Sequence, residues 1–459
     1  MVVFETMLST EEQLLISLAD LLNDPPREDR VGRCLSAGVD WGRLMALGNH
    51  HRMTPMMHSL FSRLNDERIP ETVRSVLDSI YEENRARNLD LANHLSSLAK
   101  SFKELSIDCM ILKGLYMART VFQDMAWRPM ADIDLLVRKE DMSRADALLT
   151  KHGFACEAES APRRFYHFVH FHLSFVHQPR SKVPIVVELH WALQDRYRVL
   201  HIDTEGVWQR SEEWSFDDRP VRIMNHEDLL IYLCYHVDKH SCFSRYVRDF
   251  SSIRAEEILS TESQVKLLWY LEILLLLKQT QKSMNWNVIF DRCYQWGVQA
   301  EVRCTLESLG KLFGASLVQK PVAMLKPSPP GRLTSVLYPL LLGRPGSTGR
   351  STGTVAKRLR SILTREHPMT HFRAVKFLDI GAYILPSRES VARRYGRTGW
   401  LLCFDYIRRV AKATTLCTIV FTMLVFYGLR AIVHKATNRR QQLKQCGSLM
   451  QAVQDGSQQ

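Results

Sequence analysis

The sequence predicts an α+β protein in which a segment of alternating strands and helices lies between two helical regions. In residues 1–105, apolar residues recur at intervals of three and four, the spacing of amphipathic helices. Residues 106–200 alternate short β-branched, apolar runs with helical stretches, and residues 201–325 are expected to form a helical domain, with a helical pattern over 225–320. A chain of 459 residues is long enough for two or three domains.

The N-terminal helical region is expected to contain four helices, of which the last is the longest. Their expected bounds are Glu11–Leu22, Trp41–Leu47, Pro55–Leu64 and Pro70–Leu105. The long segment keeps its apolar spacing throughout, which favours one continuous helix.

The central segment contains two carboxylates in one strand-like run. Asp132 and Asp134 lie two residues apart in Met130–Val137, which is rich in β-forming residues. Because residues i and i+2 of a strand point to the same face, the acids are expected side by side, with Ile133 and Leu135 in the core behind them. Adjacent carboxylates repel unless a positive charge lies between them, and Mg²⁺ favours carboxylate oxygens. A metal site is one interpretation, and a polar, solvated strand face is the other.

An anion-binding turn is expected before the acids. A strand-like run ends in Lys113 and Gly114, and Leu115–Phe122 has a helical pattern. A glycine turn between strand and helix leaves backbone N–H groups free for an anion, and Lys113 adds a positive charge. Arg128 lies four residues before Asp132 and is suited to binding a phosphate. The alternative is an ordinary strand-to-helix turn.

A helix and another strand follow the two acids. Glu140–His152 has a helical pattern that closes at Gly153, a residue type that suits the C′ position. Pro184–Trp191 is strand-like and contains Glu188, an acid that is costly among β-branched residues unless it is paired or metal-bound. Two acids on one strand, a third on a neighbouring strand and a lysine–glycine turn suit two-metal phosphoryl transfer.

Several histidines lie near these acids in the sequence. His170 and His172 share one strand face, and together with Glu188 and His190 they are a candidate zinc site. We favour the alternative, a polar strand face near the active site. His236 and His240 lie one helical turn apart, but the sequence lacks the glutamate that zinc hydrolases place directly after the first histidine. We therefore expect a helix that lines the nucleotide pocket, with Asp249 alongside.

The central motifs are accompanied by others on both sides. The central ones are ILKG (111–114), RPMADIDLLV (128–137) and VVELHW (186–191), and the flanking ones are NHHRMTP (49–55), HEDLLIYLCYHVDKH (226–240) and ILPSRESVARRYG (384–396). Together they resemble the uncharacterised nucleotidyltransferase family, a bacterial branch of the DNA polymerase β-like nucleotidyltransferase superfamily. The resemblance covers most of residues 10–250 and a patch near 375–410.

The resemblance implies a small mixed-sheet nucleotidyltransferase core, with helical regions on its N-terminal and C-terminal sides. It implies that the catalytic acids also bind the metal, which is expected to be two Mg²⁺ ions. It also implies that the lysine–glycine turn and Arg128 line the nucleotide site. The metal-binding residues are then Asp132, Asp134 and Glu188, and the nucleotide-binding residues are Lys113, Gly114 and Arg128. The segment Ser251–Glu272 does not resemble the family and is interpreted as an insertion between two helices.

We therefore expect a Mg²⁺-dependent nucleotidyltransferase that moves a nucleotidyl group from an NTP to a hydroxyl or phosphate acceptor. The acceptor is left open between a small molecule, a saccharide and a peptide. The alternative is a catalytically inactive, membrane-tethered nucleotide-binding or scaffold protein, which the retention of all three acids disfavours. Nucleic acid is not expected as a partner, because the basic tail lacks interleaved aromatic residues and any RNA-module signature.

The positive charge of the chain is concentrated near its C-terminus. Residues 331–459 contain 21 Lys and Arg against 5 Asp and Glu, whereas the whole chain has a net charge of +12. We interpret 326–385 as a linker and basic region, and 386–459 as a basic tail. Its apolar run 413–429 indicates a membrane-embedded helix, a buried helix or an interfacial helix. The basic charge favours contact with an anionic membrane.

Cysteine usage and the N-terminus bear on location. The ten cysteines are scattered without a C-x-x-C pair, which is typical of reduced thiols in a cytosolic protein. The N-terminus lacks the basic start of a signal peptide. A cytoplasmic location is expected, with membrane association through the apolar run as an option.

Overall fold

The structure, a computed structural model, describes most of the first 325 residues. The described residues are 8–22, 28–157, 171–178, 183–194, 201–240, 255–261, 263–314 and 316–325. The expected linker and basic region (326–385), the basic tail (386–459) with its apolar run 413–429, His170 and Asp249 lie outside the described residues.

A single mixed sheet positions the acids. Among the described residues its seven strands follow the order β3-β4-β5-β2-β1-β7-β6. The central strand β2 pairs in parallel with β5 and antiparallel with β1, and β1 pairs in parallel with β7. The strands are β1 Cys109–Ile111, β2 Asp132–Val137, β3 Ala155–Cys156, β4 His172–His177, β5 Ile185–His190, β6 Glu212–Phe216 and β7 Arg219–Ile223. The expected α+β class and mixed-sheet core are confirmed.

Two strands extend the sheet beyond the central segment. The hairpin β6–β7 follows residue 200, in a region that the sequence analysis interpreted as helical. Asp217 and Asp218 both adopt positive φ, 49° and 60°, which is the backbone of a tight hairpin turn that aspartate tolerates. The sheet therefore draws on residues 212–223 as well as on 106–200.

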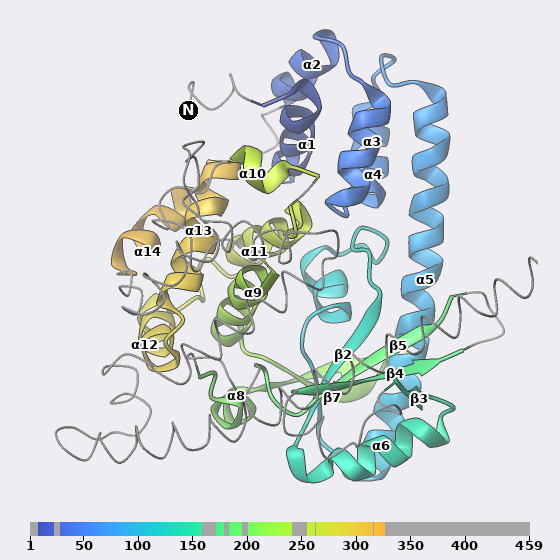
Figure 1. Cartoon of the computed structure of the whole chain (residues 1–459), viewed down its shortest axis with the longest axis vertical. Helices are drawn as coiled ribbons and strands as arrows, with labels where there is room; N and C mark the ends of the chain where they lie inside the picture. Colours follow the sequence, from blue (N-terminus) through green and yellow to red (C-terminus); the bar gives the residue numbers. More distant parts are fainter. Residues whose placement is uncertain are drawn as a thin grey trace, which may run out of the picture. The chain divides into compact units, whose positions relative to one another are not determined.

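The N-terminal region forms five helices within the described residues. They are α1 Thr10–Leu21, α2 Glu28–Ser36, α3 Trp41–His50, α4 Thr54–Leu64 and α5 Glu71–Glu104. Four agree closely with the expected helices, and α2 was not predicted. The 34-residue α5 runs alongside the sheet, with Leu91, Leu95 and Ala99 among its buried residues (Figure 1).

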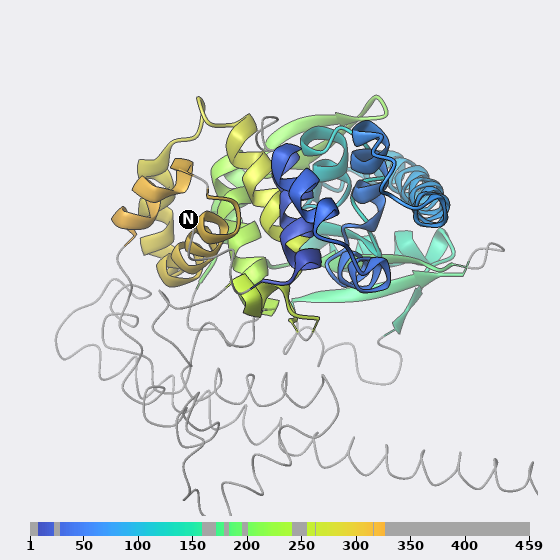
Figure 2. The same ribbon diagram turned by 90° about the horizontal axis from the view of Figure 1, so that it is seen from above.

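Helices from the rest of the chain lie on both sides of the sheet. Figure 1 shows α6 on one side of the sheet and α9 and α11 on the other. These helices are α6 Met142–Lys151, α8 Thr204–Arg210, α9 His226–His240, α10 Ala255–Leu259, α11 Leu267–Gln279, α12 Trp286–Trp296, α13 Gln299–Phe313 and α14 Gln319–Met324. As expected, α6 closes at Gly153, whose φ is 82°. Figure 2 shows α9, α11, α12 and α13 gathered on the side away from α5.

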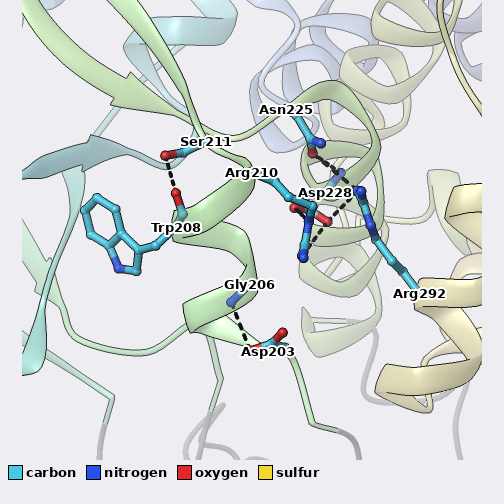
Figure 3. A network of polar contacts seen from close by, with 8 residues as sticks. All are labelled: Asp203, Gly206, Trp208, Arg210, Ser211, Asn225, Asp228 and Arg292. Atoms are coloured by element: carbon cyan, nitrogen blue, oxygen red, sulfur yellow. Dashed lines mark hydrogen bonds and ion pairs between the residues drawn. The ribbon is translucent and has the colours of Figure 1, made fainter.

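A buried ion-pair network fastens α8 and α12 to the start of α9. Asp228 lies between two arginines (Figure 3). Its carboxylate accepts from Arg210 Nε at 3.0 Å and from Arg292 Nη1 at 2.8 Å, while Asn225 Oδ1 accepts from the Asp228 backbone N–H at 3.0 Å. Burial raises the pKa of Asp228, and the two arginines oppose that rise. The network fixes α9, which covers the acids, to its neighbours.

Replacing Arg292 by Gln is expected to lower the free energy of unfolding by about 2 kcal/mol, because a charged hydrogen bond to the buried Asp228 is lost while Arg210 remains. The midpoint of urea unfolding measures this change. Arg144→Gln is the control, since Arg144 is half exposed and binds Asp141 and the Leu105 carbonyl at the surface. Equal midpoints for the two variants would contradict a stabilising role for the network.

Candidate active site

Three carboxylates lie together on one face of adjacent strands. Asp132 and Asp134 of β2 point to the same face, whereas Ile133 and Leu135 are buried on the other. In the parallel pairing of β2 with β5, Asp134 lies directly opposite Glu188. The common face follows from the pleat, since residues two apart on a strand point the same way and paired residues share a face. The arrangement expected of the three acids is thus present.

The three acids differ in exposure and in pKa. Burial raises the pKa of Asp132 to about 6, and the nearby Asp134 adds to the rise. Burial also disfavours the charged form of Asp134, but Lys113 and His190 hold its pKa below the usual value. The Glu188 side chain is 28% exposed, compared with 3% for Asp134. Burial favours the neutral form of Glu188, but the hydrogen bond from His190 together with the charges of His172 and His190 lowers its pKa. The site therefore carries concentrated negative charge with its more open side at Asp132 and Glu188.

The lysine–glycine turn faces the acids. Lys113 follows β1, and its Nζ lies 3.3 Å from Asp134 Oδ2. The backbone of Gly114 has a φ of 44°, so the chain turns there in the left-handed region that glycine adopts readily. The expected helix Leu115–Phe122 is shorter and wider, a π-helix over Met117–Val121. It closes with the Phe122 N–H donating to the Met117 carbonyl at 3.0 Å.

Arg128 is buried against a helix from a distant part of the chain. Its Nε lies 2.8 Å from Glu272 Oε1 of α11, and the side chains are 9% and 1% exposed. Asn88 of α5 donates from Nδ2 to the Arg128 carbonyl at 2.8 Å. Glu272 belongs to the segment that the sequence analysis interpreted as an insertion. That segment supplies α10, the first part of α11 and the partner of Arg128.

A further arginine holds the two acid-bearing strands together. Arg87 of α5 donates from Nη2 to the Ala131 carbonyl at 3.1 Å and to the Pro184 carbonyl at 2.7 Å. These carbonyls directly precede β2 and β5. Arg87 therefore fixes the alignment of β2 with β5 at the end where Asp132 begins β2. Local spacing does not connect Arg87 with this position, because Arg87 lies in the middle of the long helix α5.

Arg52 is a site residue that sequence reasoning did not identify. It lies between α3 and α4 with a φ of 60°, an unusual backbone for arginine. Burial lowers the pKa of its guanidinium, the neighbouring Arg128 lowers it further, and Asp132 and Glu272 oppose the shift. Within the described ranges, no carboxylate forms an ion pair with the Arg52 side chain. The only sequence signal was its place in the motif NHHRMTP.

The corner that carries Arg52 is fixed by the histidine before it. His51 is fully buried, and its Nε2 lies 2.9 Å from the Leu259 carbonyl. Its Nδ1 accepts from the Leu267 N–H at 3.3 Å. These contacts join the α3–α4 corner to the start of α11. They hold Arg52 in place, although the two segments are more than 200 residues apart in the sequence.

Helix α9 packs over the acid-bearing face. Burial raises the pKa of Tyr232, and the charges of Asp134 and Glu188 add to the rise. Burial lowers the pKa of His236, and Lys113 lowers it further. The His236 and His240 rings lie 4.7 Å apart and both contact Trp269. These contacts support the interpretation of α9 as a helix lining the site.

Two histidines lie beside the acids. His190 Nε2 lies 3.3 Å from Asp134 Oδ1 and 3.4 Å from Glu188 Oε2. His172 Nε2 lies 4.0 Å from Glu188 Oε1. Burial favours the neutral form of His190, but hydrogen bonds to the two carboxylates raise its pKa. As the strand pattern predicted, His172 lies opposite the buried Leu173 and Phe175 and faces the acids.

A cavity of about 700 Å³ lies elsewhere in the fold, and none of the acids lines it. Its walls come from α1, α2, α10, α13 and α14, with Arg30, Arg33 and Lys311 among the lining residues. We place the chemistry at the acids because carboxylates and cations converge there. In the described part of the chain, no helix has the length and apolar character needed to cross a membrane. The cysteines in the described ranges are buried.

Comparison with known proteins gives one family and one solved structure. The profile of a family described as "Uncharacterised nucleotidyltransferase" matches residues 37–314, more than half of the chain. The chain is similar, at 14% identity and a TM-score of 0.29, to the crystal structure of an antigenic nucleotidyltransferase-like protein from Paracoccidioides brasiliensis. That similarity covers 51% of this chain and 92% of the other, and its TM-score is too low to support an argument. No curated protein matches the chain.

Proposed function

The chain belongs to the uncharacterised nucleotidyltransferase family, and we propose that it moves a nucleotidyl group from an NTP to a hydroxyl or phosphate acceptor in a Mg²⁺-dependent reaction. One observation carries the proposal: Asp132, Asp134 and Glu188 converge on one face of two parallel strands. The direct test is whether the α-phosphate of an NTP becomes attached to an acceptor.

The donor set fits the proposed metal. Carboxylate oxygens are the ligands that Mg²⁺ prefers, and Asp132 and Asp134 present two of them side by side, with Glu188 next to Asp134. Burial raises the pKa of Asp132 and the neighbouring Asp134 adds to the rise, so a cation bound by the two acids would favour their charged forms. When bound by these acids, Mg²⁺ would neutralise charge on the phosphate oxygens. We propose two such ions, with Glu188 completing one of the sites.

The cations around the acids are suited to a triphosphate. Lys113 pairs with Asp134 in the free protein, and a phosphate at the Gly114 turn would compete for the same ammonium group. Arg128 would contribute its positive charge from its pair with Glu272. Arg52 lies near Arg128 and Asp132, and no carboxylate of the described residues forms an ion pair with its guanidinium, which suits it to bind a phosphate. We propose that these three cations hold the NTP.

Glu188 is the acid best suited to accept a proton from the acceptor. Among the carboxylates of the site that form ion pairs, Glu188 is the most exposed. Its lowered pKa keeps it ionised near neutral pH. In the proposed reaction the acceptor oxygen attacks the α-phosphorus, its proton passes to Glu188, and pyrophosphate leaves.

The proposal also covers the acceptor and the cellular location of the protein. The acceptor is a small molecule, saccharide or peptide with a free hydroxyl or phosphate. We propose a cytoplasmic location, which the scattered cysteines without a C-x-x-C pair support, with contact to an anionic membrane through the basic tail. A catalytically inactive scaffold is the outcome that failure of nucleotide transfer would favour.

Replacing Arg52 by Gln is expected to weaken NTP binding by about 10- to 100-fold, because one charged contact to phosphate is lost. Isothermal titration with a non-hydrolysable NTP in Mg²⁺ measures the change. Arg43→Gln is the matched control, since Arg43 lies on the preceding helix, α3, is half exposed and pairs with Glu11 and Glu12. Unchanged affinity in Arg52→Gln would remove Arg52 from the nucleotide site.

A further inference from the structure

We propose that His172, Glu188 and His190 form a binding site for Zn²⁺ beside the Mg²⁺ site at Asp132 and Asp134. This inference goes beyond the proposed nucleotidyl transfer and does not depend on it, because metal binding is measured without nucleotide. Glu188 would be shared by the two sites, and the histidines would set the identity of the second metal.

The distances among the ligand atoms suit a small cation. One atom from each of the three side chains lies within 4.8 Å of the others. His190 Nε2 lies 3.4 Å from Glu188 Oε2, and His172 Nε2 lies 4.0 Å from Glu188 Oε1. Zinc–ligand distances of about 2.0–2.1 Å in a tetrahedron place neighbouring ligand atoms about 3.4 Å apart. The ligands are therefore close to coordinating separation in the free protein.

The backbone that carries these ligands is regular sheet. His172 lies opposite His190 in the antiparallel pairing of β4 with β5, and Ser174 lies opposite Glu188. Because His172, Glu188 and His190 lie at alternate positions, the pleat directs all three toward one face. The rings of His172 and His190 lie 4.9 Å apart. A site on paired strands is held more precisely than one on a loop.

The chemistry of the ligands selects the metal. Imidazole nitrogen suits zinc and other first-row transition ions, whereas Mg²⁺ is bound by oxygen atoms. Two histidines and one glutamate are the three protein ligands of a common type of zinc site, which keeps a fourth position open. Asp134 Oδ1 is 3.3 Å from His190 Nε2, so a second carboxylate adjoins the site. The competing interpretation is that His190 only holds Asp134 and Glu188 in place by hydrogen bonding.

Equilibrium dialysis of the full-length protein against Zn²⁺, in a large excess of Mg²⁺, tests the site. One Zn²⁺ per chain should remain bound, and His172→Ala should weaken that binding by at least about 100-fold. His177→Ala is the matched control, because His177 lies on the same strand but on the opposite face, where it contacts the Gly153 carbonyl. His172→Gln serves as the second variant, with circular dichroism used to verify that both variants fold.

Cobalt substitution identifies the ligands. Co²⁺ in the wild-type protein should give visible absorption bands of nitrogen and oxygen ligation, without the intense sulfur-to-cobalt band that cysteine ligands produce. The bands should be lost in both folded His172 variants and retained in His177→Ala. Failure of the wild-type protein to retain Zn²⁺ would overturn the inference, as would a thiolate spectrum or equal binding by wild type and folded His172 variants. None of these results would contradict the proposed Mg²⁺-dependent nucleotidyl transfer, which is tested separately.

Discussion

Asp134→Asn is expected to reduce nucleotidyl transfer by a factor of about 10³ or more, and Asp132→Asn by a similar factor. Each substitution keeps the shape of the side chain but removes one charge from the shared metal site. A loss of about 4 kcal/mol in transition-state stabilisation corresponds to this factor, and a metal's contribution is of that size. Glu188→Gln should also reduce transfer while retaining Mg²⁺ at one position.

Metal binding provides an independent measurement for these variants. The wild-type melting temperature should rise with Mg²⁺ concentration, because a ligand that binds the native state stabilises it, and the rise should be absent in Asp132→Asn and Asp134→Asn. Asp291→Asn is the control, since Asp291 is exposed on α12 and far from the acids in sequence. Near wild-type turnover in either active-site variant would show that the metal assignment is wrong.

Arg128→Met is expected to lower the free energy of unfolding by about 3–5 kcal/mol, because Glu272 would be left as a buried charge without its partner. For a domain of this size the melting temperature should fall by about 10 °C. Differential scanning calorimetry measures both quantities.

The double variant Arg128→Met/Glu272→Leu separates the structural role of Arg128 from its proposed role in nucleotide binding. Replacing a buried ion pair by apolar side chains is often close to neutral, so most of the lost stability should return. NTP affinity should stay low in the double variant, since the cation is still missing. Recovery of both stability and affinity would limit Arg128 to a structural role.

The local pattern of the sequence was sufficient to predict the acid-bearing strands. The two-residue spacing of Asp132 and Asp134 fixes their common face. The apolar residues that alternate with them fix which face packs into the hydrophobic core. The same reasoning placed His172 on the acid side of its strand. These predictions succeed because strand periodicity depends only on neighbouring residues.

The remaining parts of the site depend on contacts between distant segments. Arg52 reaches the acids because His51 joins the α3–α4 corner to α11, and Arg128 is buried because α11 supplies Glu272. Neither partner is indicated by local spacing. The hairpin β6–β7 had a local signal, alternating apolar residues around Asp217 and Asp218, which the helical interpretation of 201–325 overlooked.

The most direct test of the account follows the α-phosphate. Full-length protein and Mg²⁺ are incubated with each NTP, labelled at either the α- or the γ-phosphate, in extract of the organism that carries the gene. Nucleotidyl transfer predicts that label from the α-position, but not from the γ-position, becomes attached to an acceptor, and that Asp134→Asn abolishes the labelling. Labelling from the γ-position alone, or no labelling by a wild-type protein that binds both NTP and Mg²⁺, would contradict the proposed function.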